Sequence, residues 1–555
     1  MNNSQVEVRY CGAVHRVPAG IRVDEFLRRA DGELSDTVLA ALVNRRQVML
    51  DFSLRGRVEL DLVRYGDREG ESVYKRSVCL MMYEACKQLY PEVRLVVGQS
   101  LGNSYHYLVR GKHPGLEVIA PAIEARMSEL HREARPFRRE TVTLEEIEDY
   151  FRKVGADEKL QLLGTLRSST VHTISCGSFV DIAHGPCAPH TGCLPTFAVL
   201  PFGDGLVLRF PRRARRDQLP PFNPPELLFK TAVETRHWQE LLGVHHVGQL
   251  NRLCLDGEVL HILRIAEGFH EKKIAQIADE ILSRGEDLRL VTIAGPSASG
   301  KTTFAKRLSI QLRVNGIVPV ALSLDNYYVD REATPRDEDG NPDFESLEAV
   351  DLPLFHQHLS ELLAGREVLT PRYDFQSGCR KPPDKWQPMR LAEHQVLLVE
   401  GIHGLNERLT KTVPKSHKYR IFISALSQLA IDNHNRIFTA DARLIRRIVR
   451  DRLFRGFSAE RTLDLWERVR HGEGRWIFPF QEQADVMFNS ALVYEPAVLK
   501  TYAERFLLQV SRTSPAYTEA YRLLKFLSLF APIFPDEVPY TSILREFIGG
   551  STFSY

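Results

Sequence analysis

The stretch "LRLVTIAGPSASGKTTFAKRL", residues 288–308, constrains the fold of this chain more than any other feature. A short apolar run is followed by a glycine-bounded loop and then by a helical pattern. Residues 295–302 match G-x-x-x-x-G-K-[ST] in full, and they lie between a predicted strand and a predicted helix, as the motif requires. The glycines let backbone N–H groups face phosphate oxygens, and the helix adds the positive end of its dipole. We therefore expect a binding site for ATP or GTP.

Two side chains of this loop have expected roles of their own. Lys301 should reach the β- and γ-phosphates, which makes it a candidate catalytic residue, and the Thr302 hydroxyl should ligate Mg²⁺. The expected nucleotide-binding residues of the segment are Gly295, Ser297, Ala298, Ser299, Gly300, Lys301, Thr302 and Thr303.

Five apolar runs after residue 284 predict strands that alternate with helices. They are "LRLVTIA", "VPVALSLD", "HQVLLVEG", "YRIFISA" and "ADVMFNSAL". Four of them are short, β-branched and almost continuously apolar, which is typical of parallel strands buried on both faces. The pattern predicts a doubly wound α/β domain, and such domains bind ligands at the carboxyl ends of their strands.

Acidic residues stand at the ends of two of these predicted strands. Asp325 follows "ALSL", where a carboxylate can accept a proton from an attacking hydroxyl or help to hold a metal ion. Glu400 follows "VLLV", where it can complete the Mg²⁺ shell. A single acid at a strand end is often a helix cap, but two beside a phosphate loop favour chemistry. We expect Asp325 to be the catalytic base and Glu400 to be a metal ligand.

The segment "TADARLIRRIVRDRLFRG", residues 439–456, carries six arginines on one predicted helix and its exit. A solvated basic face is one interpretation. The other is a lid, because phosphoryl transfer needs cations that close over the γ-phosphate and exclude water. We expect Arg443, Arg447 and Arg450 to belong to the lid and the remaining arginines to lie on the surface.

Residues 288–500 resemble the uridine kinase branch of the uridine kinase and phosphoribulokinase family. The resemblance rests on "GPSASGKTT", "LDNYY", "PRYDF", "VEGI" and "ARLIRRIVRD", which occur in the order of the family. It implies phosphorylation of a nucleoside 5′-hydroxyl by ATP or GTP with Mg²⁺, most often on uridine or cytidine. By position, Asp325 matches the catalytic base and Glu400 the acid of the metal shell.

The same resemblance implies an acceptor pocket. Tyr373 and Phe375 match an aromatic wall for the base, Tyr328 lies in "LDNYY", and Glu345 falls where the family usually has an aspartate on the sugar hydroxyls. Gly378 stands where the family commonly carries a histidine that reads the pyrimidine. A glycine cannot make that contact, so the preferred nucleoside stays open.

The first 210 residues resemble two modules of threonyl-tRNA synthetases. Residues 4–65 look like a TGS domain, a small β-grasp unit. Residues 66–210 look like the second additional domain, on "ACKQLYPEVRLVVGQSLGNSYHY" and "DIAHGPCAPHTGCL". The positions that carry the synthetase's editing or metal-binding residues hold other side chains here, namely Arg76, Leu80, Ala183 and Cys187. Leucine and alanine cannot ligate a metal, so the inherited site is dismantled. Whether the cluster of Cys187, Cys193, His184 and His190 binds metal stays open.

These observations predict a multidomain chain with an N-terminal α+β half and a C-terminal P-loop kinase domain on a parallel sheet. The expected parts are 1–65 (TGS-like), 66–210 (synthetase-like), 211–283 (linker and helices), 284–510 (kinase) and 511–555 (helical tail). The balance of 73 basic and 71 acidic residues gives +2, which favours neither nucleic acid nor membrane. Eight scattered cysteines and no long apolar run fit a cytoplasmic protein.

Two other functions remain open. The chain could be a regulatory P-loop protein that binds tRNA or other RNA through its N-terminal half, or a kinase of the same fold that acts on another hydroxyl compound. A homo-oligomer is a further expectation, because kinases of this family are often oligomers. The intact Asp325, Glu400 and arginine-rich helix favour the nucleoside kinase.

Overall fold

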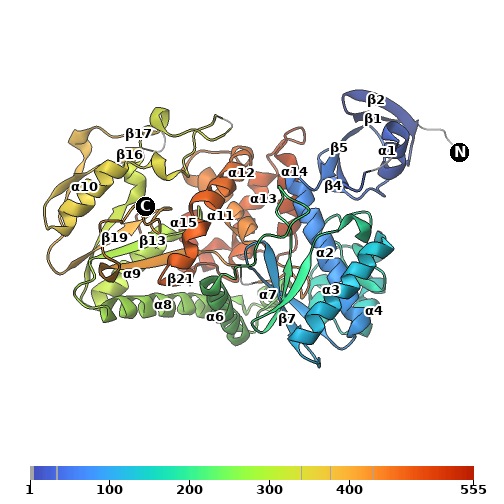
Figure 1. Ribbon diagram of the computed structural model, residues 1–555, viewed down its shortest axis with the longest axis horizontal. Coiled ribbons are helices and arrows are strands. Elements are labelled where there is room, and N and C mark those ends of the chain that lie inside the picture. Colours follow the sequence, from blue (N-terminus) through green and yellow to red (C-terminus); the bar gives the residue numbers. More distant parts are fainter. Residues whose placement is uncertain (1–4, 33–34, 339, 375–376, 428, 555) are drawn as a thin grey trace.

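The computed structural model describes residues 5–32, 35–338, 340–374, 377–427 and 429–554 (Figure 1). The first part is a small α+β unit, as predicted. Its elements are β1 (Gln5–Tyr10), β2 (Ala13–Pro18), α1 (Val23–Asp31), β3 (Val38–Val43), β4 (Arg46–Val48) and β5 (Val58–Arg64). The strand order is β2-β1-β5-β3-β4, and β1 and β5 run parallel. Val8, Phe26 and Leu60 lie in its apolar core.

The second part is a mixed α+β module around the long helix α2 (Arg68–Leu89), which ends two residues before Pro91. Its helices are α3 (Leu116–Glu133), α4 (Leu144–Val154) and α5 (Asp157–Leu163). Its strands are β6 (Arg94–Ser100), β7 (Ser104–Arg110), β8 (Phe137–Thr143), β9 (Thr170–Cys176), β10 (Phe179–Ile182), β11 (Ala198–Phe202) and β12 (Gly205–Arg209). They form two sheets, ordered β10-β9-β8 and β11-β12-β7-β6. A capping box of Thr143 and Glu146 opens α4, and Gly155 closes it in the left-handed conformation.

The described chain has no regular helix or strand between β12 and α6. Three helices follow: α6 (Glu226–Leu242), α7 (Val247–Leu255) and α8 (Val259–Ser283). Helix α8 leads into the C-terminal sheet.

That sheet contains the five predicted strands, all parallel: β13 (Leu290–Ala294), β14 (Val318–Ser323), β19 (Gln395–Glu400), β20 (Lys418–Ser424) and β21 (Val486–Asn489). Their order is β14-β19-β13-β20-β21. Alternate residues enter two separate cores: Val291 and Leu398 pack with α8 and α9 (Lys301–Val314), whereas Leu290 and Leu397 pack with α10 (Leu352–Leu363). The sheet is therefore covered on both faces, as its apolar strands predict.

Helices α11 (Thr439–Phe454), α12 (Ala459–Trp476) and α13 (Glu495–Leu507) pack beside this sheet (Figure 1). Two short hairpins stand before β19: β15 (Val368–Thr370) with β18 (Gln387–Met389), and β16 (Tyr373–Asp374) with β17 (Cys379–Arg380). The last helices are α14 (Tyr517–Leu527) and α15 (Arg545–Ile548).

The C-terminal helices are part of the body of the molecule. Arg522 of α14 forms a two-bonded ion pair with Asp441 of α11, with both N–O distances 2.7 Å. The Thr518 hydroxyl donates to the carbonyl of Arg45 in the first part. Helix α14 thus joins the N-terminal unit to α11 (Figure 1). No helix among the described residues has the length and apolar character needed to cross a membrane.

Candidate active site

Three neighbouring strands bring the predicted chemistry to one edge of the sheet. The phosphate loop follows β13, Glu400 is the last residue of β19, and Asp325 lies in the turn after β14. Glu400 is paired with Ile293 on one side and with Ser323 on the other. Because the strands are parallel, their carboxyl ends meet at the same edge. The parallel order β14-β19-β13 therefore brings the loop and both acids together.

The phosphate loop has the backbone that the motif requires. Gly300 has φ +88°, and a side chain on Gly295 would lie 2.2 Å from the carbonyl oxygen of Ile423. Ala298 also has a positive φ of 58°, which is uncommon for a residue with a side chain. The Lys301 ammonium donates to the carbonyl of Gly295 at 2.9 Å, so it lies folded over the loop.

The two acids share an enclosed and negatively charged site. Burial raises the pKa of Asp325, and the nearby Lys301 partly offsets this effect. Burial and the neighbouring Asp325 raise the pKa of Glu400 to about 7. The Ser323 hydroxyl donates to Glu400 Oε1 at 3.1 Å. Two carboxylates and the Thr302 hydroxyl are hard oxygen donors, and a divalent cation would relieve their repulsion, so this set fits Mg²⁺.

The arginines of α11 divide into two groups. The Arg447 guanidinium donates to Ser297 Oγ of the phosphate loop at 2.8 Å, and Arg450 pairs with Asp451 at 2.7 Å. Both line the cavity that also contains Lys301 and Asp325. Arg455, which the sequence predicted to lie on the surface, lines the same cavity. Arg455 carries its charge near Asp325.

Arg443 and Arg446 are both buried in ion pairs, which differs from the positions that the sequence predicts for them. Arg443, expected in the lid, is 2% exposed and is held by Glu473 of α12. Arg446, expected on the surface, is fully buried and pairs with Glu495 at 2.5 Å. Both side chains point into the packed interior, where helix–helix contacts leave no aqueous face.

Tyr328, Tyr373 and Glu345, which the family resemblance assigns to acceptor binding, line one cavity with Lys301 and Asp325. The rings of Tyr328 and Tyr373 lie 5.7 Å apart. Burial raises the pKa of Glu345 to about 7, with a further contribution from Glu473. Glu345 Oε2 is enclosed and accepts no hydrogen bond from the residues that the structure describes. A side chain on Gly378 would lie 2.6 Å from the guanidinium of Arg331. Phe375 falls outside the described residues.

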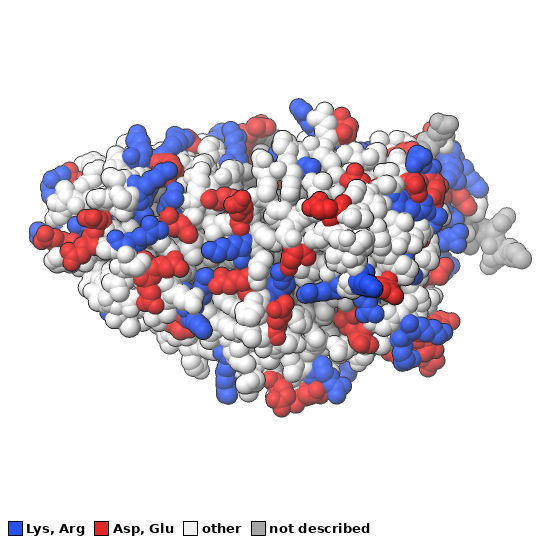
Figure 2. Space-filling view, turned by 60° about the horizontal axis from the view of Figure 1, so that its bottom comes forward, with Lys and Arg blue, Asp and Glu red and all other residues white. Residues whose placement is uncertain are grey.

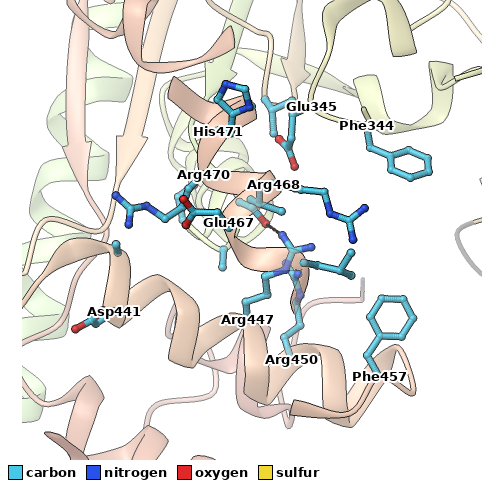
Figure 3. Close-up of a pocket in the computed structure, with 18 of the residues that line it drawn as sticks. Phe344, Glu345, Asp441, Arg447, Arg450, Phe457, Glu467, Arg468, Arg470 and His471 are labelled. Atoms are coloured by element: carbon cyan, nitrogen blue, oxygen red, sulfur yellow. Dashed lines mark hydrogen bonds between the residues drawn. The ribbon is translucent and has the colours of Figure 1, made fainter. Parts of the chain in front are cut away.

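One cavity of about 2040 Å³ joins these groups (Figure 3). Lys301, Asp325, Glu400 and Tyr373 line it, and the walls continue along α12 and to α2 of the synthetase-like module. Helix α12 adds residues that the sequence analysis missed: Arg461, Arg468 and Arg475. Their spacing of seven residues, which places them on one face of a helix, was the available signal.

Residues 290–494 match the family model of the phosphoribulokinase / uridine kinase family. The chain therefore carries a kinase-type P-loop domain in its C-terminal half. Two solved structures resemble this part. A Bacillus stearothermophilus protein described as a possible uridine kinase has a TM-score of 0.28 and 19% identity, over 39% of this chain and 98% of that one. D-glycerate 3-kinase from Cryptococcus neoformans has a TM-score of 0.22 and 15% identity, over 48% and 89%.

The N-terminal region resembles threonine–tRNA ligases. The ligase of Desulforamulus reducens is 30% identical over 192 residues, which are 34% of this chain and 30% of the ligase. The ligase of Symbiobacterium thermophilum is 32% identical over 190 residues, 34% of this chain and 29% of the ligase. The chain thus spans less than a third of the length of these curated relatives.

A segment of the kinase half packs against the synthetase-like module. The segment 429–438 leads into α11, and the His434 ring lies against the Tyr83 ring, with 4.3 Å between the centroids and an angle of 44° between the planes. The Asp181 carboxylate lies 3.2 Å from His434 Nδ1. Tyr83 is three residues from Leu80, and Asp181 is two from Ala183. The segment 429–438 thus packs beside Leu80 and Ala183, two of the positions at which the sequence departs from the synthetase pattern.

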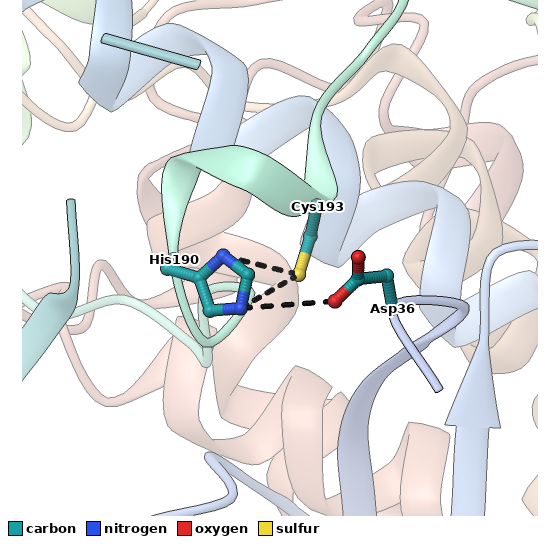
Figure 4. A group of neighbouring side chains, drawn as sticks. All are labelled: Asp36, His190 and Cys193. Atoms are coloured by element: carbon teal, nitrogen blue, oxygen red, sulfur yellow. Dashed lines mark hydrogen bonds and ion pairs between the residues drawn. The ribbon is translucent and has the colours of Figure 1, made fainter. Parts of the chain in front are cut away.

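The cysteines and histidines of this module do not converge on one point. Cys187 packs in the core near Arg76, and burial raises its pKa to about 11. His184 faces Asp432 at 3.7 Å. Cys193 lies near His190 and Asp36 (Figure 4), with its sulfur 3.8 Å from both ring nitrogens, so these three side chains are close together while Cys187 and His184 lie elsewhere. Another group, Asp181 with Asp432, already surrounds the Lys159 ammonium at 2.5 and 3.0 Å.

Proposed function

We propose that this chain is a kinase that transfers the γ-phosphate of ATP or GTP to the 5′-hydroxyl of a nucleoside, with uridine and cytidine as first candidates. The observation that carries the proposal is the meeting of Lys301, Asp325 and Glu400 on one cavity with Arg447. A protein that only binds a nucleotide needs the phosphate loop, but it does not need an acid at the acceptor side of that loop.

The chemistry follows from the positions of these groups. The acceptor oxygen forms a bond to the γ-phosphorus while the bond from that phosphorus to the β-bridging oxygen breaks, and the hydroxyl proton passes to Asp325. Lys301 and Arg447 stabilise the charge that develops on the phosphoryl oxygens. Mg²⁺, when bound by Thr302 and Glu400, would neutralise charge on the donor phosphates. The raised pKa of Asp325 suits a base that must accept a proton.

The acceptor assignment rests on Tyr373, Tyr328 and Glu345. Two aromatic rings offer a flat apolar surface to a base, and a carboxyl group can accept hydrogen bonds from sugar hydroxyls. Gly378 offers no side chain to read the base. Recognition of the base must then come from other groups of the cavity, such as Arg331 beside Gly378.

The test is transfer of labelled γ-phosphate from ATP and from GTP, with Mg²⁺, to uridine, cytidine, thymidine, adenosine, guanosine and inosine. Transfer to uridine or cytidine supports the proposal as stated. Transfer to another nucleoside alone keeps the mechanism and changes the substrate. The Lys301→Ala variant is the control for a contaminating kinase. No transfer to any member of the panel at millimolar acceptor would contradict a nucleoside kinase.

A second candidate is an RNA-binding protein that uses its P-loop domain as a switch. The similarity of the N-terminal region to threonine–tRNA ligases favours it. Against it, Lys/Arg and Asp/Glu side chains are interspersed over the face shown in Figure 2, and the net charge is only +2. Phosphate contacts would make tRNA binding fall steeply with salt. Failure to bind tRNA at about 50 mM salt would eliminate this candidate.

A further inference from the structure

A carboxylate from the C-terminus lies at the start of the helix that follows the phosphate loop. Glu546 Oε2 accepts the backbone N–H of Thr303 at 3.0 Å and the Thr303 hydroxyl at 2.7 Å. Thr303 is in the first turn of α9, directly after the two side chains of the motif, Lys301 and Thr302. Glu546 comes from α15, which is far away in the sequence.

The donors that Glu546 uses are of the kind that hold a nucleotide. N–H groups in the first turn of a helix after a phosphate loop face phosphate oxygens, and the dipole of the helix favours an anion there. The loop cradles the α- and β-phosphates, and Lys301 reaches towards the γ-phosphate. A triphosphate bound with its γ-phosphate at Lys301 would bring the phosphate nearest the nucleoside towards Thr303, one residue further into the helix. A carboxylate on its N–H competes with that phosphate.

The segment that carries Glu546 packs directly against the phosphate loop. The methyl group of Ile543 lies 2.5 Å from the point where a side chain on Gly300 would begin, so the segment covers the loop directly. Phe547 and Ile548 are buried in the kinase core, and the Arg446 guanidinium lies 5.0 Å from the Phe547 ring. Glu546 is therefore positioned by its neighbours and is not a mobile surface side chain.

The residues after α15 extend the same cover. Gly549, Gly550, Ser551 and Phe553 line the central cavity together with Thr302. Lys306, one turn into α9, donates to the carbonyl of Ser554. The C-terminus lies beside α15, near the central strands (Figure 1). The segment 543–554 thus borders the loop on the side of Thr302 and Lys306.

Repulsion between negative charges weakens the contact of Glu546 with Thr303. Glu546 adds to the negative charge of Asp325 and Glu400, and it is one of the groups that raise the pKa of Glu400. A triphosphate brings several further negative charges to the same place. It cannot share the N–H of Thr303 with a carboxylate at hydrogen-bond distance.

We propose that Glu546 occupies the subsite of the phosphate nearest the nucleoside, so that the C-terminal segment 543–554 must withdraw before ATP or GTP binds. The inference rests on the proposed nucleotide site. It makes Glu546 a residue that sets donor affinity, and it makes the segment a built-in competitor of the donor.

The experiment measures MgATP binding to the full-length chain by calorimetry, without any acceptor. We expect Glu546→Gln and Glu546→Ala to bind MgATP at least about ten-fold more tightly than the unaltered protein, because the charged competitor is gone. Asp536→Asn is the matched control, since Asp536 is an exposed acid of the same C-terminal region. It should leave the affinity unchanged. Thermal unfolding of each variant shows that it is folded, and the near-isosteric Glu546→Gln serves if Glu546→Ala is not.

Unchanged or weaker binding in folded Glu546→Gln would overturn the inference while leaving the nucleotide site intact. Absence of MgATP binding in the unaltered protein and in both variants would overturn the proposed function, and this inference with it. A second measurement is amide hydrogen exchange. MgATP should accelerate exchange in residues 543–554 of the unaltered protein, and slower or unchanged exchange there would contradict the withdrawal.

Discussion

Arg443 and Glu473 form an enclosed ion pair beside the phosphate loop, with N–O distances of 2.8 and 2.5 Å. Glu473 Oε1 also accepts the backbone N–H of Ser297 at 3.0 Å. The pair therefore ties α11 and α12 to the loop, and Arg443 acts on the shape of the site and not on the phosphates directly. Two neighbouring arginines contact the loop directly: Arg447 donates to Ser297 Oγ, and Arg446 donates to the carbonyl of Ala298.

Removing one partner of this pair should cost much stability. Arg443→Ala leaves the Glu473 carboxylate buried without its counter-ion, and a loss of about 3–5 kcal/mol in the free energy of unfolding is expected. Urea denaturation measures it. Arg468→Ala, on an exposed position of α12, is the control and should change stability by less than about 0.5 kcal/mol. Equal, small effects of both variants would show that the pair does not support the loop.

Lys301→Ala should abolish phosphoryl transfer while the protein stays folded. The variant loses the cation that meets the γ-phosphate, and a fall in kcat of about 10²–10³-fold or more is expected. Turnover with the best acceptor of the panel is the measurement. Arg313→Ala, at the exposed end of the same helix, removes a positive charge without touching the loop. Similar activity in the two variants would remove Lys301 from the mechanism.

Asp325→Asn should separate chemistry from donor binding. An amide cannot accept the hydroxyl proton, so kcat should fall by about 10²–10⁴-fold. The affinity for MgATP should be kept or improved, because a negative charge near the phosphates is lost. Steady-state kinetics and calorimetry on the same sample give both values. A variant with full kcat would show that Asp325 is not the base.

The acceptor carboxyl Glu345 predicts a dependence of stability on pH. Its pKa is raised to about 7 in the folded protein, against about 4.3 in an unfolded chain. Between these values the folded state binds more protons than the unfolded state. The contribution of Glu345 to the free energy of unfolding is therefore fully present below about pH 4 and is lost as pH rises towards about 7. Glu345→Gln removes the loss of stability that comes from ionising this enclosed carboxyl group at high pH.

The variant should be more stable than the unaltered protein at pH 8 by about 1–2 kcal/mol, with no such gain at pH 4. Thermal unfolding across this range is the measurement. Glu332→Gln, at an exposed position, is the control and should show no pH-dependent gain. A constant difference from pH 4 to pH 8 would contradict a raised pKa at Glu345.

Lys159 joins the two halves of the chain through ion pairs with a carboxylate from each half. Its ammonium is 1% exposed and lies between Asp181 of the synthetase-like module and Asp432 of the kinase half. Lys159→Met leaves two buried carboxylates without a cation, so the contact between the halves should loosen, with a loss of about 3–5 kcal/mol. Limited proteolysis should then cut in the segment 429–438. Lys153→Met, exposed on α4, should leave the pattern unchanged.

Part of this architecture could be predicted because its causes are local. The phosphate loop depends on glycines and on a strand and helix within about twenty residues. The capping box of Thr143 and Glu146 depends on residues three apart. Asp325 and Glu400 are far apart in the sequence, yet they could be placed together, because parallel strands end at the same edge of their sheet.

Other features depend on which surfaces meet in three dimensions. The pattern of α11 does not distinguish Arg446, buried against Glu495, from Arg447, which faces the loop. The choice is made by helices α12 and α13, whose carboxylates come from distant parts of the chain. The approach of His434 to Tyr83 likewise depends on the docking of the two halves.

The sequence by itself determined the phosphate loop, the five-stranded parallel core and the strand-end acids, since these arise from backbone conformation and from the alternation of apolar residues. Only the tertiary structure decided which arginines face the cavity and that Glu546 reaches Thr303. The sequence around a carboxylate does not indicate which distant residue it will contact. Its position follows from how Ile543, Phe547 and Ile548 are buried, and that packing is a property of the whole fold.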